Sequence, residues 1–161
     1  MSDDIAREQA IIIYERALRH QQRGHFADAI VLYKRSLAMY PTAEAATFLG
    51  WTYSMMNRYD EAIEWCRKAI EIDPDFGNPY NDIGAYLIEL GRWEEAISWL
   101  ERATTATRYE NPEFAYLNLG RVYQHLGRYR TALKQYDQAL HLNRFYRSAA
   151  YAKYGLLGRL N

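Results

Sequence analysis

Four segments of this chain repeat at intervals of 33 to 36 residues, and this period constrains the fold more than any other feature. A short phrase recurs as FADAIVLY, YDEAIEWC, WEEAISWL and YRTALKQY, with its alanines at Ala29, Ala62, Ala96 and Ala132. A repeat of this length is one supersecondary unit that buries its apolar face against its neighbours. The sequence therefore predicts a stack of similar units.

Apolar residues within a unit follow helical spacing. In the second unit, Ala46, Leu49 and Tyr53 are three and four residues apart and so share one helical face. A residue that tolerates the left-handed conformation follows at the same register in every unit. These four residues are Gly24, Asn57, Gly91 and Gly127. Each unit is thus predicted to be two helices joined by a tight turn.

On these residues the chain resembles the tetratricopeptide repeat family, whose repeat has about 34 residues. The small eighth residue of that repeat is matched by Ala17, Gly50, Gly84 and Gly120, and its closing proline by Pro41 and Pro74. The resemblance implies an all-α, right-handed superhelical solenoid of four helix-turn-helix repeats plus a C-terminal capping helix. We expect one domain over residues 1–161, with repeats at about 10–42, 43–76, 77–112 and 113–146 and the cap at about 146–158.

Two units depart from the family pattern at their ends. Arg108 stands at the proline position of the third unit, and about two extra residues precede Pro112, which predicts an offset or bend at that junction. Arg144 replaces the proline of the fourth unit, which predicts that the last helix of this unit runs on further.

The neutral total charge hides an asymmetry along the chain. Residues 43–120 carry 14 acidic and six basic side chains, whereas residues 121–161 carry eight basic side chains and one acidic one. The neutral total gives no general attraction to polyanions. Only the basic end favours a nucleic-acid-associated adaptor, and the neutral total and the acidic middle argue against one. The single cysteine, Cys66, excludes an intramolecular disulfide, and the polar N-terminus lacks the pattern of a secretory signal. We expect a cytoplasmic protein without a membrane segment.

Stacked helix pairs curve, so the resemblance implies a concave groove that is lined by the first helix of each unit and receives a peptide or a helix of a partner protein. Eleven positions are predicted to line it: Tyr14, Leu18, Trp51, Met55, Asn78, Asn81, Ala85, Glu89, Leu117, Arg121 and Gln124, with Tyr151 of the cap as an extension. Trp51 is the strongest candidate, because tryptophan and arginine dominate interface hot spots. Packing of Trp51 between repeats, and helix capping by Asn78 and Asn81, are the alternatives.

Other classes of function find less support. No unit has the lysine and asparagine pair that the carboxylate-clamp chaperone adaptors of this family use, so we expect no such binding. The four histidines are scattered along the chain, and we predict no metal site, no cofactor and no catalytic residue. The second candidate function is a self-assembling structural unit, a homo-oligomer formed head to tail or through the apolar cap.

Overall fold

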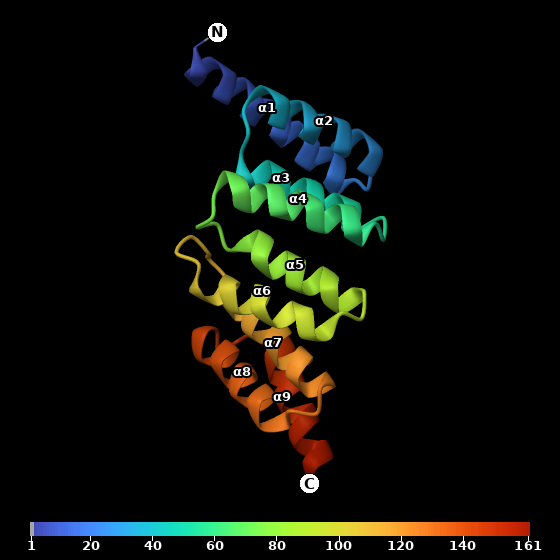
Figure 1. Cartoon of the computed structure of the whole chain (residues 1–161), viewed down its shortest axis with the longest axis vertical. Coiled ribbons are helices and arrows are strands. Elements are labelled where there is room, and N and C mark those ends of the chain that lie inside the picture. Colours follow the sequence, from blue (N-terminus) through green and yellow to red (C-terminus); the bar gives the residue numbers. More distant parts are fainter. Residues whose placement is uncertain (1) are drawn as a thin grey trace.

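The computed structural model describes residues 2–161, and this part of the chain forms nine helices and no extended strand. They are α1 (Asp3–Gln22), α2 (Phe26–Met39), α3 (Ala43–Ser54), α4 (Tyr59–Ile72), α5 (Asn78–Glu89), α6 (Trp93–Thr105), α7 (Glu113–His125), α8 (Tyr129–Leu142) and α9 (Arg147–Leu160). Four helix pairs stack along the long axis, with the N-terminus at one end and α9 at the other (Figure 1). The predicted all-α superhelical repeat fold is confirmed.

The same turn joins the two helices of every pair. Gly24, Asn57, Gly91 and Gly127 all have positive φ angles, of 76°, 58°, 73° and 74°. In the first turn the amide of Gly24 donates to the carbonyl of Gln21 (3.0 Å) and the amide of His25 donates to that of His20 (2.9 Å). This pair of bonds is the Schellman motif, and all four turns have it at the same register. The predicted helix breakers are confirmed.

Small residues let the helices of a pair approach closely. A Cβ atom added at Gly50 of α3 would lie 2.8 Å from the carbonyl oxygen of Ala62 in α4. At Gly84 it would collide with the side chain of Leu100, and at Gly120 with the ring of Tyr136. The glycines at the eighth repeat position are therefore required by the packing.

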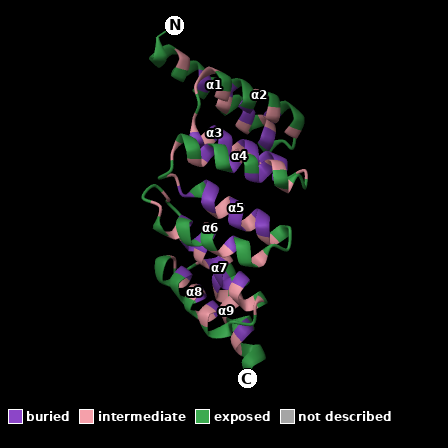
Figure 2. Cartoon of the chain, in the orientation of Figure 1, coloured by how far each residue is buried: buried purple, intermediate pink, exposed green. Residues whose placement is uncertain are grey.

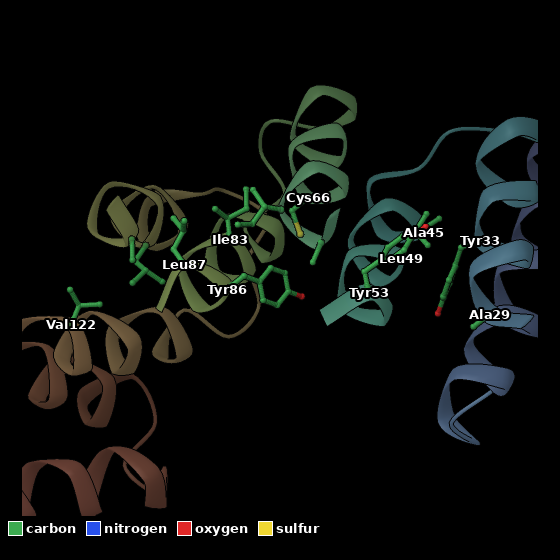
Figure 3. Packing of buried hydrophobic residues seen from close by; sticks show 14 of the residues in the cluster. Ala29, Tyr33, Ala45, Leu49, Tyr53, Cys66, Ile83, Tyr86, Leu87 and Val122 are labelled. Atoms are coloured by element: carbon green, nitrogen blue, oxygen red, sulfur yellow. The ribbon is translucent and has the colours of Figure 1, made fainter. Parts of the chain in front are cut away.

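The core runs along the stack between the helices (Figure 2). Figure 3 follows its largest cluster from Tyr33 of α2 through Leu49 of α3 and Cys66 of α4 to Val122 of α7. A second cluster joins α7, α8 and α9 around Tyr136. Because burial runs without a break from one unit to the next, each unit depends on its neighbours for stability.

Both ends of the chain extend beyond the predicted helices. Helix α1 begins at Asp3, well before residue 10, because the Ser2 hydroxyl accepts a bond from the Ile5 amide (3.5 Å) and acidic Asp3 and Asp4 favour a helix N-terminus. Helix α9 covers Arg147–Leu160, where the cap was expected at 146–158. The four helix pairs lie within the four expected ranges apart from this early start.

The predicted extension of the last helix in the fourth unit is wrong. Helix α8 ends at Leu142, the repeat position at which α4 ends at Ile72. The Asn143 side chain accepts a hydrogen bond from the Phe145 amide (3.2 Å), as the Asp73 side chain accepts one from the Asp75 amide (3.0 Å). This Asx turn ends the helix without a proline.

The extra residues before Pro112 lie in the loop between α6 and α7, which runs along the loop between α4 and α5. The amide of Arg108 donates to the carbonyl of Asp75 (3.0 Å), and the amide of Gly77 donates to the carbonyl of Arg108 (3.0 Å). A Cβ atom at Gly77 would collide with the side chain of Tyr109, so glycine is needed there. The loop thereby ties the third unit to the second.

Candidate partner-binding groove

The odd-numbered helices lie on one side of the stack. Helix α5 contacts both α3 and α7, and α7 contacts α9, whereas no two even-numbered helices of the described chain make comparable contacts. The side on which successive helices approach one another is the inner side of a curved stack. We call this surface, formed by α1, α3, α5, α7 and α9, the inner face. Ten of the eleven predicted groove residues lie on its helices, and the eleventh, Met55, is the C-cap of α3.

The N-terminal half of the inner face is apolar. Tyr14 and Leu18 of α1 are half-buried and pack against the main core cluster, so each exposes only part of its side chain. Trp51 of α3 is half-buried, and Met55, at the C-terminal end of that helix, is 49% exposed. Trp65, Trp93 and Trp99 pack against the main core cluster, whereas Trp51 does not. This half therefore presents an indole and a thioether to solvent.

The middle of the inner face is polar. Asn78 is exposed at the start of α5, and this helix has Gly77 as its N-cap and no side-chain capping bond. The Asn81 side-chain oxygen accepts a hydrogen bond from the Asn118 amide group of α7 (3.0 Å). The Asn118 oxygen in turn accepts one from Arg121 (3.4 Å). Neither Asn78 nor Asn81 caps a helix here, and the amide group of Asn81 remains available to donate.

Two further predicted residues, Ala85 and Glu89, complete the middle part. Ala85 is half-buried on α5, and Glu89 is exposed at the C-terminal end of the same helix. The Glu89 carboxylate takes part in no side-chain hydrogen bond and no ion pair within the described chain. Glu89 therefore leaves a free negative charge between the apolar half of the inner face and Arg121.

Two predicted groove residues serve the fold. Leu117 is only 3% exposed and belongs to the α7–α9 core, so it presents almost no surface. The Gln124 side-chain oxygen accepts a hydrogen bond from the Tyr136 hydroxyl (2.7 Å), as the Gln21 oxygen accepts one from the Tyr33 hydroxyl (2.6 Å) in the first unit. This structural role of Gln124 was not predicted from the sequence, because the tyrosine partner lies 12 residues later, on the second helix.

A hollow of about 650 Å³ lies at the C-terminal end of the inner face, between α7, α8 and α9. Its lining residues include Trp93, Arg121, Gln124, His125, Tyr129, Tyr136, Tyr151, Gly155 and Arg159. Arg121, Gln124 and Tyr151 were predicted for this face from the sequence. Arg159 of α9 and Trp93 of α6 were not predicted, because the repeat register assigns groove positions only to the first helix of each unit. No acidic residue lines the hollow, and neither arginine has an ion-pair partner within residues 2–161. We call it the basic hollow.

A second hollow, of about 250 Å³, lies between α1 and α3 at the other end of the stack. Ile11 and Tyr14 give it an apolar wall, and Arg7, Glu15 and Glu44 lie at its edge. The Glu44 carboxylate accepts a hydrogen bond from Arg108 (2.7 Å), so the loop before α7 holds this side chain. The inner face thus has a concave surface near each end, and charged side chains of both signs line only the N-terminal one.

The histidines are not all scattered, contrary to the sequence analysis. His20 and His25 lie side by side across the first turn, with ring centroids 5.8 Å apart, and Asp28 lies beside them. His125 stacks on the indole of Trp93 with 3.9 Å between ring centroids.

No helix among residues 2–161 has both the length and the apolarity needed to cross a membrane.

Models of the tetratricopeptide repeat match residues 14–75 and 75–144, which together cover most of the chain. The type IV pilus assembly protein PilF of Pseudomonas aeruginosa is 29% identical over 146 residues, an alignment that spans 89% of this chain and 58% of that protein. A subunit of the anaphase-promoting complex from Arabidopsis thaliana, subunit 6, is 25% identical over 138 residues, spanning 83% of this chain and 25% of that protein. The chain thus spans less than two thirds of the curated relatives it matches.

Solved structures show the same architecture. The structure of Pseudomonas aeruginosa PilF aligns with a TM-score of 0.86 and 29% identity, over 98% of this chain and 70% of that one. A crystal structure of MamA aligns with a TM-score of 0.76 and 25% identity, over 94% of this chain and 84% of that one.

Proposed function

Because the chain belongs to the tetratricopeptide repeat family, whose members mediate protein–protein interactions, we propose that its inner face binds a peptide or a helix of a partner protein. The observation that carries this proposal is the row of accessible apolar and basic groups on the odd-numbered helices. Trp51 and Met55 stand in its N-terminal half, and Arg121 stands at the edge of the basic hollow.

Trp51 is the proposed anchor of the partner. Its indole is half-buried, so its orientation is fixed by the protein while part of the ring remains accessible. A side chain ordered in advance loses little conformational entropy on binding, and tryptophan is the residue type most enriched in interface hot spots. Met55, one turn later, adds a flexible apolar surface that adapts to different side chains.

The basic hollow supports a more specific proposal about the partner, which is an acidic group on the bound segment. Arg121 and Arg159 come from two different helices and meet at one hollow that has no acidic lining residue. Arginine recognises a carboxylate through charge-assisted hydrogen bonds, and the aromatic side chains of Trp93 and Tyr136 line the same hollow. We therefore expect a ligand with an apolar part for α3 and a carboxylate for α7 and α9.

Selection from a random peptide library on the immobilised protein tests this proposal. We expect enriched peptides that combine apolar and acidic residues, and we expect Trp51→Ala to weaken their binding by about tenfold or more, as for an interface hot spot. Val31→Ala is the matched control, because Val31 is an exposed apolar residue on the outer helix α2. Equal binding by Trp51→Ala, or a loss confined to Val31→Ala, would place the site elsewhere.

Members of this family are in general non-catalytic scaffolds, and we extend this to the chain as a whole. The likeness to a type IV pilus assembly protein makes pilus components the first proteins to test as partners. The cytoplasmic location remains a prediction from the sequence, which fractionation of the source cells tests.

Self-assembly is the second candidate function, because α9 and the loop that precedes it expose large aromatic side chains. Phe145 is 79% exposed, Tyr151 77% and Tyr154 65%. A head-to-tail contact between the acidic body and the basic end would weaken in high salt, whereas an apolar contact between caps would not. Light scattering at low and high salt distinguishes the two. Nucleic-acid binding has less support, since the Lys153 ammonium already pairs with Asp137 (2.7 Å).

A further inference from the structure

The turn between α1 and α2 gathers three side chains that are metal-ligand types. The ligand atoms of His20, His25 and Asp28 all lie within 4.8 Å of one another, and His20 Nδ1 is 3.9 Å from the Asp28 carboxylate. The Schellman motif causes this proximity, because its backbone bond from the His25 amide to the His20 carbonyl brings the two side chains together. This cluster lies outside the groove residues that the proposed function uses.

The corresponding turns of the other units show what these positions normally hold. In the second unit Arg58 and Glu61 form a bidentate ion pair (2.6 Å for both bonds), and the guanidinium lies over the ring of Tyr53 (4.8 Å). In the third unit Arg92 and Glu95 form the same pair (2.9 and 2.6 Å). The repeat register thus aligns Arg58 and Arg92 with His25, and their acidic partners with Asp28.

The first unit therefore keeps the carboxylate but replaces the fixed positive charge and the supporting side chain by two imidazoles. His25 stands in place of the arginine, and His20 in place of Tyr53. An arginine cannot bind a cation, whereas a neutral imidazole is the commonest metal ligand in proteins. The positions of Tyr53, Arg58 and Glu61 stabilise the turn of the second unit. The first unit is the one in which all three corresponding positions hold metal-ligand residue types.

An unsatisfied polar atom in the cluster is an independent observation. His20 Nδ1 is buried from solvent and has no hydrogen-bond partner among the described residues. Buried polar nitrogens normally have a hydrogen-bond partner, because a buried donor or acceptor without one costs on the order of 1–3 kcal/mol. Asp28 and His25 offer two further ligand atoms close to this nitrogen, so a bound cation could supply the partner that it lacks.

We propose that His20, His25 and Asp28 bind a zinc ion. Zinc takes imidazole nitrogen and carboxylate oxygen at about 2.0–2.2 Å, which places neighbouring ligand atoms about 3.4 Å apart in a tetrahedral site. The side chains of His25 and Asp28 are exposed, so rotation about their side-chain bonds closes the present spacing without moving the helices. The fourth position is open to water. Calcium and magnesium fit poorly, because both prefer oxygen ligands only.

Titration calorimetry of the whole chain with zinc chloride, in a buffer that does not chelate metal, tests the site. We expect one saturable zinc site per chain and no heat with magnesium chloride. The double variant His25→Arg with Asp28→Glu restores the ion pair of the second and third units, so it should fold normally and lose saturable zinc binding. His141→Ala, which removes a histidine of α8 outside the cluster, should bind like the wild type.

A second readout separates the site from damage to the fold. Zinc that binds only the folded chain should raise the melting temperature of the wild type and of His141→Ala but not that of the double variant. The proposal is overturned if the wild type shows no saturable zinc binding, or if the double variant binds zinc as well as the wild type does. Failure of the groove proposal would leave both results unchanged, because the peptide and the zinc ion use different residues.

Discussion

The guanidinium of Arg108 donates two hydrogen bonds to one carboxylate oxygen of Asp73, 35 residues earlier, from Nε (3.0 Å) and from Nη2 (2.7 Å). The third nitrogen of the guanidinium donates a hydrogen bond to Glu44 on the inner face (2.7 Å), and its Cζ atom lies 4.2 Å from the ring centre of Phe76. Arg108 holds the pKa of the Asp73 carboxyl below its usual range. One side chain thus links the junction of the third and fourth units to the second unit.

Arg108→Ala should change global stability little but loosen this junction. The ion pairs are exposed, and exposed pairs contribute less than about 1 kcal/mol. The backbone bond from the Gly77 amide to the Arg108 carbonyl loses its side-chain support, so hydrogen exchange at Gly77 should accelerate. Exchange followed by mass spectrometry checks this. A melting temperature that falls steeply, or an unchanged exchange rate at Gly77, would contradict the assigned role.

Gly120→Ala should destabilise the chain, although alanine favours helices. The new methyl group collides with the ring of Tyr136, which is buried and held by its bond to Gln124. Overpacking of this kind costs about 1–3 kcal/mol. Gly155→Ala is the control, because a Cβ atom there meets no atom within 4 Å and alanine should add about 0.5–1 kcal/mol of helix stability. Opposite shifts of the two melting temperatures are expected, and shifts of the same sign would contradict the packing account.

Asp82→Asn should make stability less dependent on pH. Burial raises the pKa of the Asp82 carboxyl from its ordinary value of 3.8 to about 7. Between these two values the folded chain holds a proton that the unfolded chain has released, so the stability of the wild type falls as the pH rises through this window. The full loss is on the order of 4 kcal/mol at most. Asparagine has the shape of the protonated acid and never ionises.

The melting temperatures of the wild type and of Asp82→Asn at pH 4.5 and pH 8 check this prediction. We expect the variant to be the more stable protein at pH 8, and the difference to shrink at pH 4.5. If the variant is less stable by the same amount at both pH values, then Asp82 acts through its ionised form and its assigned environment is wrong.

The sequence alone predicted the features that repeat. Gly24, Asn57, Gly91 and Gly127 recur at one register because one backbone conformation is needed at every turn. Glycine at the eighth repeat position recurs because paired helices approach equally closely in successive units. Local chemistry that occurs in every unit leaves a periodic signal, and a single chain contains four samples of it.

The sequence could not predict contacts that occur once or that join distant segments. Leu117 and Gln124 have groove-facing repeat positions, but the fit of α9 and the Tyr136 hydroxyl decide their burial. Helix α8 ends at an Asx turn, in which the Asn143 side chain accepts a hydrogen bond, although the fourth unit lacks the closing proline of the repeat. His20 and His25 come together only because the turn brings the ends of two helices side by side. The roles of Leu117 and Gln124 depend on tertiary packing, whereas the Asn143 and His20–His25 contacts are local and come from side chains outside the repeat pattern.

Site-specific photo-cross-linking tests whether the partner binds at the inner face. A benzophenone amino acid is placed at Met55 on the inner face in one sample and at Val31 on the outer helix α2 in the other, since both positions are exposed. With a peptide selected on the wild-type protein, we predict cross-linking from position 55 and none from position 31. Cross-linking from position 31 alone would show that the partner binds the outer helices, and the groove proposal would then be wrong.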